Sequence, residues 1–245
     1  MVYSGISYDN TSTLPVISWI LQNPGRSLVL ASDNLSLNTD DIYNLNYSSR
    51  PYKTVSIVIC TYGRPDSLNE TLTSLCQQTF KDFEVILLTE KGNLSELRDS
   101  GLRCARGDIV SFIDDDVYCP PTWLEGVIES FREGVVGVSG PTIVPKEYLS
   151  NRDIFKFRWL KGIYDWLFLD GKSSVPGYLS SCGTPSLASN YSESKVSFQA
   201  DYLEACNMSV KKDDAIAVKG FDDSYISTSE WCEVDLALKL KERGK

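Results

Sequence analysis

Three short apolar runs recur at similar intervals in the middle of the sequence, and this repeat limits the fold more than any other feature. The runs cover 55–60, 83–88 and 108–113, and they are rich in Val, Ile, Leu and Phe. Continuous runs of this kind are typical of strands that are covered on both faces. Because helix-like patterns separate the runs, the sequence predicts βαβ units and an α/β fold with a mainly parallel central sheet.

The segments between the runs show helical spacing. Ser67 and Glu70 form an S-x-x-E capping box, which predicts the start of the first helix. Apolar residues recur every three or four positions over 94–105 and 123–131, and a Pro-Pro pair before the second of these segments favours a helix start. A last β-branched run at 135–139 closes the series.

The parts of the chain outside this repeat have a different composition. Residues 1–52 are rich in Ser, Asn, Asp and Tyr, and we treat them as an N-terminal extension of unknown role. The Gly-, Ser- and Pro-rich stretch 171–194 predicts a mobile loop. Segment 153–168 interleaves aromatic and basic residues. A helix whose aromatic face packs on the core is the favoured interpretation, and peripheral contact with membrane headgroups is the alternative.

Composition excludes several kinds of chemistry. The chain contains no histidine, which removes Ser-His-Asp triads, HExxH zinc sites and histidine general bases. Its formal net charge of −9 disfavours general attraction to nucleic acid. The seven cysteines are scattered without a C-x-x-C pair, so we expect reduced thiols and a cytoplasmic protein. Any acid–base chemistry is then left to carboxylates.

Polar residues follow each of the three predicted strands. They are Thr61, Tyr62, Gly63 and Arg64 after the first, Glu90 after the second, and the triplet Asp114, Asp115 and Asp116 after the third. Ligands of parallel sheets bind outside the carboxyl ends of the strands. Adjacent carboxylates repel one another, and a Mg²⁺ or Mn²⁺ ion would relieve that repulsion with oxygen ligands. In an extended chain Asp114 and Asp116 project to the same side.

Six separated motifs are similar, in order and spacing, to those of family-2 glycosyltransferases. They are V-S-I-V-I-C-T-Y-G-R at 55–64, Arg98 with C-A-R-G-D at 104–108, S-F-I-D-D-D at 111–116, C-N-M at 206–208, K-G-F-D at 219–222 and E-V-D-L at 233–236. The resemblance implies an inverting enzyme with the GT-A fold, a Rossmann-like α/β/α sandwich over 53–245. Residues 53–145 would bind the nucleotide sugar and 146–245 would form the acceptor side. Relatives usually continue with another strand and often a metal-binding His, so the resemblance implies either that the chain is C-terminally truncated or that its metal site is less complete.

The resemblance assigns roles to particular residues. Those implied to bind the nucleotide sugar are Thr61, Tyr62, Arg64, Glu90, Arg98, Asp114 and Asp115. Asp116 would bind the metal that bridges the diphosphate, as Mn²⁺ or Mg²⁺. Glu233 takes the position of the general base, and Asn207, Met208, Glu230 and Trp231 are implied on the acceptor side.

Physical reasoning supports a carboxylate base near the end of the chain. Sugar transfer requires a group that accepts the proton of the acceptor hydroxyl, and without histidine a carboxylate is the natural candidate. The pattern after Glu233 is helical, so Glu233 would lie in a first turn where the helix dipole favours its ionised form. Glu230 and Asp235 remain alternatives for the base.

The expected partners are a UDP- or GDP-sugar donor and a glycan, lipid-phosphate or protein acceptor, with no nucleic acid. We expect the protein in the cytoplasm, where 153–168 would contact the cytoplasmic face of a membrane in the alternative interpretation. Two other functions compete with transfer. One is a nucleotide-sugar-binding module without catalysis. The other is a phosphotransferase of the haloacid-dehalogenase type, which Tyr118 opposes because that motif has Thr or Val there.

Overall fold

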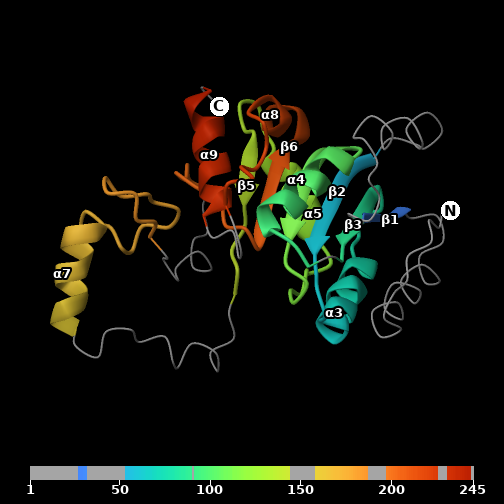
Figure 1. Cartoon of the computed structure of the whole chain (residues 1–245), viewed down its shortest axis with the longest axis horizontal. Coiled ribbons are helices and arrows are strands. Elements are labelled where there is room, and N and C mark those ends of the chain that lie inside the picture. The colour runs from blue at the N-terminus through green and yellow to red at the C-terminus, as the bar shows by residue number, and fades with distance from the viewer. Residues whose placement is uncertain are drawn as a thin grey trace.

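A computed structural model describes residues 27–31, 53–89, 91–143, 158–186, 197–225 and 231–243. Its centre is a six-stranded sheet with the strand order β1-β3-β2-β4-β6-β5 (Figure 1). The strands are β1 (Ser27–Ala31), β2 (Lys53–Cys60), β3 (Phe83–Leu88), β4 (Gly107–Ile113), β5 (Gly137–Ser139) and β6 (Asn207–Lys211).

Four neighbouring strands of this sheet run parallel. β2 pairs with both β3 and β4 in parallel, and β1 pairs in parallel with β3. β6 is antiparallel to β4 and to β5. The mainly parallel α/β fold predicted from the sequence is therefore confirmed. Part of the N-terminal extension, 27–31, contributes the edge strand β1.

Helices cover both faces of the sheet. They are α3 (Pro65–Cys76), α4 (Leu94–Cys104), α5 (Trp123–Ser130), α8 (Lys212–Ala217) and α9 (Cys232–Glu242). A further helix, α7 (Arg158–Phe168), contributes none of its described side chains to the two apolar clusters described next. α3 and α5 pack in one apolar cluster with β2, β3 and β4. α4, α8 and α9 pack in a second cluster on the opposite face. Each strand of the centre is thus buried on both sides, which explains its continuous apolar sequence.

Two helix starts differ from the prediction. α3 begins at Pro65, with Arg64 as the N-cap residue and no side-chain cap hydrogen bond. The capping box predicted at Ser67 and Glu70 is therefore wrong, because both residues lie inside the helix. Proline fits a first helical position, where its missing N–H has no partner to lose. α5 begins at Trp123, after the Pro-Pro pair rather than at it.

A buried polar cluster joins the three central strands. Glu84 is fully buried, and its carboxylate accepts hydrogen bonds from Ser56 Oγ at 2.6 Å and from Arg106 Nε at 2.8 Å. The backbone N–H of Gly107 donates to Ser56 Oγ at 2.9 Å. The paired charges and hydrogen bonds offset the cost of burying this carboxylate. The cluster fixes the register of β2, β3 and β4 at the edge opposite the carboxyl ends.

The second half of α7 exposes large apolar side chains instead of packing them on the core. Trp166 is 73% exposed and Leu167 52% exposed. Figure 1 shows this helix apart from the central sheet. The favoured interpretation of 153–168 as a core-packed helix is therefore wrong for the described part of the segment, and 153–157 lies outside the described residues.

The loop after α7 is described over 171–186 and makes local hydrogen bonds. Asp170 accepts from Tyr178 Oη at 2.7 Å and from Ser181 Oγ at 2.8 Å. The loop is connected to α9 through Asp201. The carboxylate of Asp201 accepts a hydrogen bond from the backbone N–H of Leu179 at 3.1 Å and another from Lys241 Nζ on α9 at 2.5 Å. Within the residues that the structure describes, no helix is long and apolar enough to span a bilayer.

Candidate active site

The aspartate triplet follows β4 directly, at the carboxyl edge of the parallel strands. Asp115 is fully buried, and its Oδ2 accepts a hydrogen bond of 2.5 Å from Thr61 Oγ1, which follows the neighbouring strand β2. Arg64 forms an ion pair of 2.5 Å with Asp115 Oδ1. The side chains of Asp114 and Asp116 are 44% and 54% exposed. The middle aspartate thus fastens the two strand ends together, and its neighbours present their oxygens to solvent.

Arg64 also reaches the last aspartate of the triplet. Its Nη1 lies 3.2 Å from Asp116 Oδ2, and about half of the Arg64 side chain is exposed. Gly63 has a φ of +68°, a left-handed conformation that glycine adopts without strain and that turns the chain from β2 into α3. Tyr62 is 61% exposed on this turn. Thr61, Arg64 and the triplet are therefore brought together, as the sequence predicted, and Tyr62 lies free of the core.

Arg98 connects this edge to α9. It lies on α4 with its side chain only 7% exposed, 3.9 Å from Asp114 Oδ1 and 3.8 Å from Glu233 Oε2. The same guanidinium donates to Cys232 Sγ at 3.3 Å. A buried guanidinium requires anionic or accepting partners, and these three groups supply them. Arg98 is thus placed to hold the two carboxylates on opposite sides of one cation.

Glu233 lies in the first turn of α9, as the helical pattern predicted. Its side chain is 16% exposed. Asp235, one alternative for the general base, forms an ion pair of 2.6 Å with Lys239 one turn further along the helix. The other alternative, Glu230, lies outside the described residues, and so does Glu90.

Burial sets the electrostatics of the site. Desolvation raises the pKa of Asp114, the Arg98 guanidinium opposes this rise, and Asp116 adds to it. Desolvation also raises the pKa of Glu204, and the nearby Glu233 contributes in the same direction. Burial raises the pKa of Cys60 to about 12, so this thiol remains protonated at neutral pH. The site therefore carries crowded acidic groups that a cation would relieve.

Two of the carboxylates are suited to a divalent cation. Asp114 and Asp116 present partly exposed oxygen atoms, the ligand type that Mg²⁺ and Mn²⁺ prefer. Among the described residues, no group of three or more Asp, Glu, Cys or His side chains is arranged to hold a metal. The donor set therefore fits an ion that takes its remaining ligands from substrate phosphates and water, as Mg²⁺ commonly does.

The residues expected on the acceptor side are dispersed. Met208 is fully buried in β6 and packs in the apolar cluster under α4 and α9. Asn207 is half-buried, and its Oδ1 accepts a hydrogen bond of 3.0 Å from Trp123 Nε1. Trp231 is 42% exposed at the N-terminus of α9, with a left-handed φ of +73°. Of these, only Asn207 and Trp231 have surface that a ligand could reach.

Sequence reasoning missed several groups around Arg98 and Glu233. Glu204, Tyr202, Cys60 and Cys206 interact electrostatically with Asp114 or Glu233. They come from β2 and from the turn before β6. Cys60 and Cys206 belong to the motifs at 55–64 and 206–208, but the resemblance assigns no role to them. Tyr202 and Glu204 lie outside the six motifs, and they reach the site because β6 pairs with β4.

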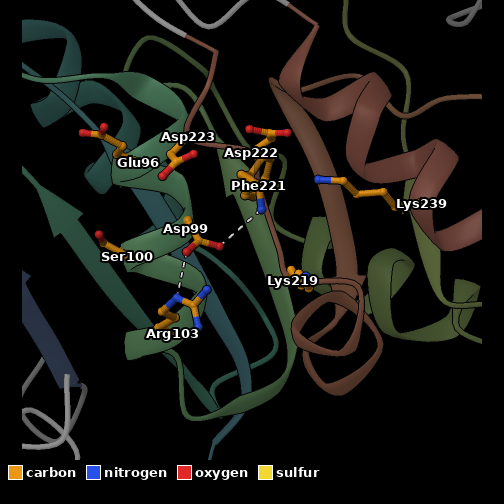
Figure 2. Close-up of a pocket in the computed structure, with 9 residues that line it drawn as sticks. All are labelled: Glu96, Asp99, Ser100, Arg103, Lys219, Phe221, Asp222, Asp223 and Lys239. Atoms are coloured by element: carbon orange, nitrogen blue, oxygen red, sulfur yellow. Dashed lines mark hydrogen bonds and ion pairs between the residues drawn. The ribbon is translucent and has the colours of Figure 1, made fainter.

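A depression of about 450 Å³ lies elsewhere, between α4 and the segment 219–223 (Figure 2). It is lined by four acidic and three basic side chains, and by none of the predicted site residues. Two of its three basic side chains are paired within the protein, Arg103 with Asp99 and Lys239 with Asp235. Asp99 accepts from Arg103 at 2.7 Å and from the backbone N–H of Phe221 at 3.2 Å. Because these pairs tie the K-G-F-D segment to α4, we interpret the depression as structural.

Comparison with known families identifies the chain. The model of glycosyl transferase family 2 matches residues 56–89 and 88–177. The chain belongs to this family. The resemblance read from the six motifs is thus confirmed, and so is the enzyme class of the family, a glycosyltransferase. The matched range of this family-2 chain includes Thr61, Arg98 and the aspartate triplet, and it ends before Glu233.

Curated relatives of this family-2 chain are distant. It is 27% identical over 139 residues to a glucosyl-dolichyl phosphate glucuronosyltransferase of Haloferax volcanii, covering 44% of each chain. It is 24% identical over 138 residues to the glycosyltransferase EpsJ of Bacillus subtilis, covering 42% of this chain and 40% of the relative. The match therefore spans less than half the length of either relative.

Solved structures similar to the chain include TarS 1–349 of S. aureus. This structure gives a TM-score of 0.46 and 15% sequence identity, and the match covers 76% of this chain and 55% of TarS 1–349. Another is the mannosyltransferase PcManGT of Pyrobaculum calidifontis, solved with GDP-Man and Mn²⁺. It gives a TM-score of 0.44 and 14% identity, and covers 88% of this chain and 57% of that one.

Proposed function

We propose that this family-2 chain is an inverting glycosyltransferase that moves a sugar from a nucleotide diphosphate to an acceptor oxygen. One observation carries the proposal. The half-exposed Asp114 at the carboxyl edge of the sheet and Glu233 on α9 share the buried cation Arg98, at 3.9 and 3.8 Å. A donor-side carboxylate and a candidate base are thereby kept at a fixed separation.

Glu233 acts as the general base in this proposal. Its carboxylate takes the proton of the acceptor hydroxyl while that oxygen attacks the anomeric carbon of the donor. The bond from the anomeric carbon to the diphosphate oxygen breaks in the same displacement, which inverts the configuration, and the nucleoside diphosphate leaves with the electron pair. Such a base contributes roughly 10²–10⁴-fold to the rate. Arg98 holds the Glu233 carboxylate in place, with Nη1 3.8 Å from Oε2.

The donor side is formed by Asp114, Asp116 and Arg64. A Mn²⁺ or Mg²⁺ ion held by Asp116 and Asp114 would neutralise the charge that develops on the departing diphosphate. Arg64 orients Asp116 through their 3.2 Å ion pair, and Thr61 fixes the turn through Asp115. Tyr62, 61% exposed on the same turn, is proposed to contact the nucleotide base.

The acceptor is proposed to be a lipid-linked phosphate or glycan. The support is the Haloferax volcanii relative, whose name gives a dolichyl phosphate lipid as its substrate. We also propose a cytoplasmic location, because the seven cysteines are odd in number and scattered without a C-x-x-C pair, which favours reduced thiols over a disulfide framework. Trp231, Asn207 and the loop 171–186 belong to the acceptor side in this proposal.

The test combines donor binding with turnover. UDP- and GDP-sugars are screened by thermal shift with and without Mn²⁺, because a bound donor stabilises the fold by mass action. Asp116→Asn should abolish the metal-dependent shift. Glu233→Gln should keep the shift and lower transfer by at least about 10²-fold. Donor binding without any transfer or donor hydrolysis in the parent would instead favour a binding module, and full activity of Glu233→Gln would remove Glu233 from the mechanism.

A further inference from the structure

Cys232 is the first residue of α9, and its side chain is fully buried beside the candidate base. Its Sγ accepts a hydrogen bond of 3.3 Å from Arg98 Nη1 and donates one of 3.7 Å to Glu233 Oε2. The same Nη1 lies 3.8 Å from the same Oε2. The thiol, the guanidinium nitrogen and the carboxylate oxygen therefore form a closed triangle of contacts.

A thiol suits this position because it is neutral and can both donate and accept a hydrogen bond. Desolvation raises the pKa of Cys232, and the charge of Arg98 only partly opposes that rise, so the thiol keeps its proton at neutral pH. A guanidinium has donors and no acceptor, whereas an ionised carboxylate has only acceptors, so a group between them must supply both. The Cys232 thiol supplies both without adding a charge to a site where acidic groups are already crowded.

The two carboxylate oxygens of Glu233 differ in their surroundings. Oε2 is held by both Arg98 and Cys232. Oε1 makes no hydrogen bond or ion pair with any residue that the structure describes, and it is not one of the buried polar atoms that lack a partner. Because 16% of the side chain is exposed, a small hydroxyl group can approach this second oxygen. The carboxylate thus has one anchored oxygen and one available oxygen.

We propose that Cys232 is a positioning residue for the general base: with Arg98 it holds Oε2 of Glu233, so that Oε1 takes the proton of the acceptor hydroxyl. The O–H bond of the acceptor breaks as the bond from hydrogen to Oε1 forms, and its electron pair attacks the anomeric carbon. The thiol keeps its proton throughout. The inference rests on the proposed function, which assigns the base to Glu233, and deepens it by naming the basic atom and the group that orients it.

Core packing is the alternative role of a fully buried cysteine. Cys232 belongs to the apolar cluster of α4, α8 and α9. Alanine and serine have nearly equal volumes, so Cys232→Ala and Cys232→Ser leave nearly the same space unfilled and differ in the hydroxyl group. A packing role predicts the same loss in both variants. A positioning role predicts that serine recovers part of the function, because its hydroxyl can again donate to Glu233 and accept from Arg98.

The first measurement requires no substrate. Infrared difference spectra between the parent and Cys232→Ala give the S–H stretching band of Cys232. In a Glu233→Gln background this band should move to higher wavenumber, because a neutral amide oxygen is a weaker acceptor than a carboxylate. The matched control is Cys119, a second buried thiol in the other apolar cluster, whose band should stay unchanged. A Cys232 band that Glu233→Gln does not move overturns the inference.

The second measurement is turnover. The probe is the UDP- or GDP-sugar selected by thermal shift, with water in place of the acceptor hydroxyl, and release of the nucleoside diphosphate is followed. Cys232→Ala should lower kcat about tenfold and leave KM for the donor unchanged, because the buried thiol acts on the base and not on the donor. Cys232→Ser should recover about threefold of this loss. Cys119→Ala should turn over like the parent.

The outcomes separate this inference from the proposed function. The inference alone is overturned if Glu233→Gln lowers turnover while Cys232→Ala keeps the kcat of the parent, or if the alanine and serine variants lose equally. The proposed function fails, and the inference with it, if the parent releases no nucleoside diphosphate from any donor screened although the Cys232 band moves in the Glu233→Gln background. The triangle of contacts would then serve the structure and not a reaction.

Discussion

Replacing Arg98 by methionine tests whether the buried guanidinium holds the site together. Methionine keeps most of the apolar stem of the side chain and removes only the charge. Two carboxylate oxygens lie 3.8 and 3.9 Å from the guanidinium. Removing one partner of a buried ion pair costs about 3–5 kcal/mol, because the remaining charge stays desolvated. Asp114 is 44% exposed and partly screened by water, so we expect the lower end, about 3 kcal/mol. For a chain of this size that corresponds to a fall in Tm of roughly 6–12 °C.

Arg103→Met is the matched control, because it removes a second arginine from the same helix. Arg103 is 42% exposed and pairs with Asp99 one turn away, a surface pair worth about 0.5 kcal/mol or less. Urea unfolding at pH 7 gives both free energies of unfolding. If the free energies of unfolding of the two variants differ by less than about 1 kcal/mol, Arg98 is not the central cation that the geometry indicates. Arg98→Lys should recover part of the loss, since it restores the charge without the planar fork.

Two further perturbations follow from the contacts. Gly107→Ala should destabilise the fold by about 2 kcal/mol, because its Cβ would lie 2.7 Å from Ser56 N. Gly126→Ala on α5 is the control: its Cβ would meet nothing within 4 Å, so the substitution should be neutral or stabilising. Denaturant titration compares the two free energies of unfolding, and equal effects would contradict the close strand packing at Gly107. Asp114→Asn should raise the free energy of unfolding at pH 7 by less than about 1 kcal/mol and abolish donor binding. Because the pKa of Asp114 is raised in the folded state, ionisation of Asp114 destabilises the parent as the pH rises through that pKa. The stability gained by Asp114→Asn should therefore vanish below the ordinary aspartate pKa of 3.8. A gain in stability that persists below this pH would show that ionisation of Asp114 is not its cause.

The sequence predicts the central strands well because burial on both faces leaves a continuous apolar pattern. The boundaries of β3 match the run at 83–88, and β4 starts one residue before the run at 108–113. The sequence predicts the surroundings of α7 less well. An amphipathic pattern reports that one side of a helix needs an apolar partner, but it does not distinguish a protein core from a surface outside the molecule. The exposed fraction of Trp166 decides that question, and it is a property of the tertiary structure.

Some residues of the site can be predicted from the local sequence, whereas the roles of others depend on the tertiary structure. The aspartate triplet and Thr61 are predictable because both follow parallel strands, whose carboxyl ends meet at one edge of the sheet. The role of Arg98 is not predictable from the sequence, because an arginine on a helix is usually a solvated surface charge. Here the side chain is 7% exposed, and α9, more than 130 residues later, supplies both Cys232 and Glu233 as its partners. A desolvated cation in that position holds the donor-side carboxylate and the candidate base in one electrostatic unit. Substitutions at Arg98 should therefore affect donor binding and transfer together, whereas Glu233→Gln should lower transfer and leave donor binding unchanged.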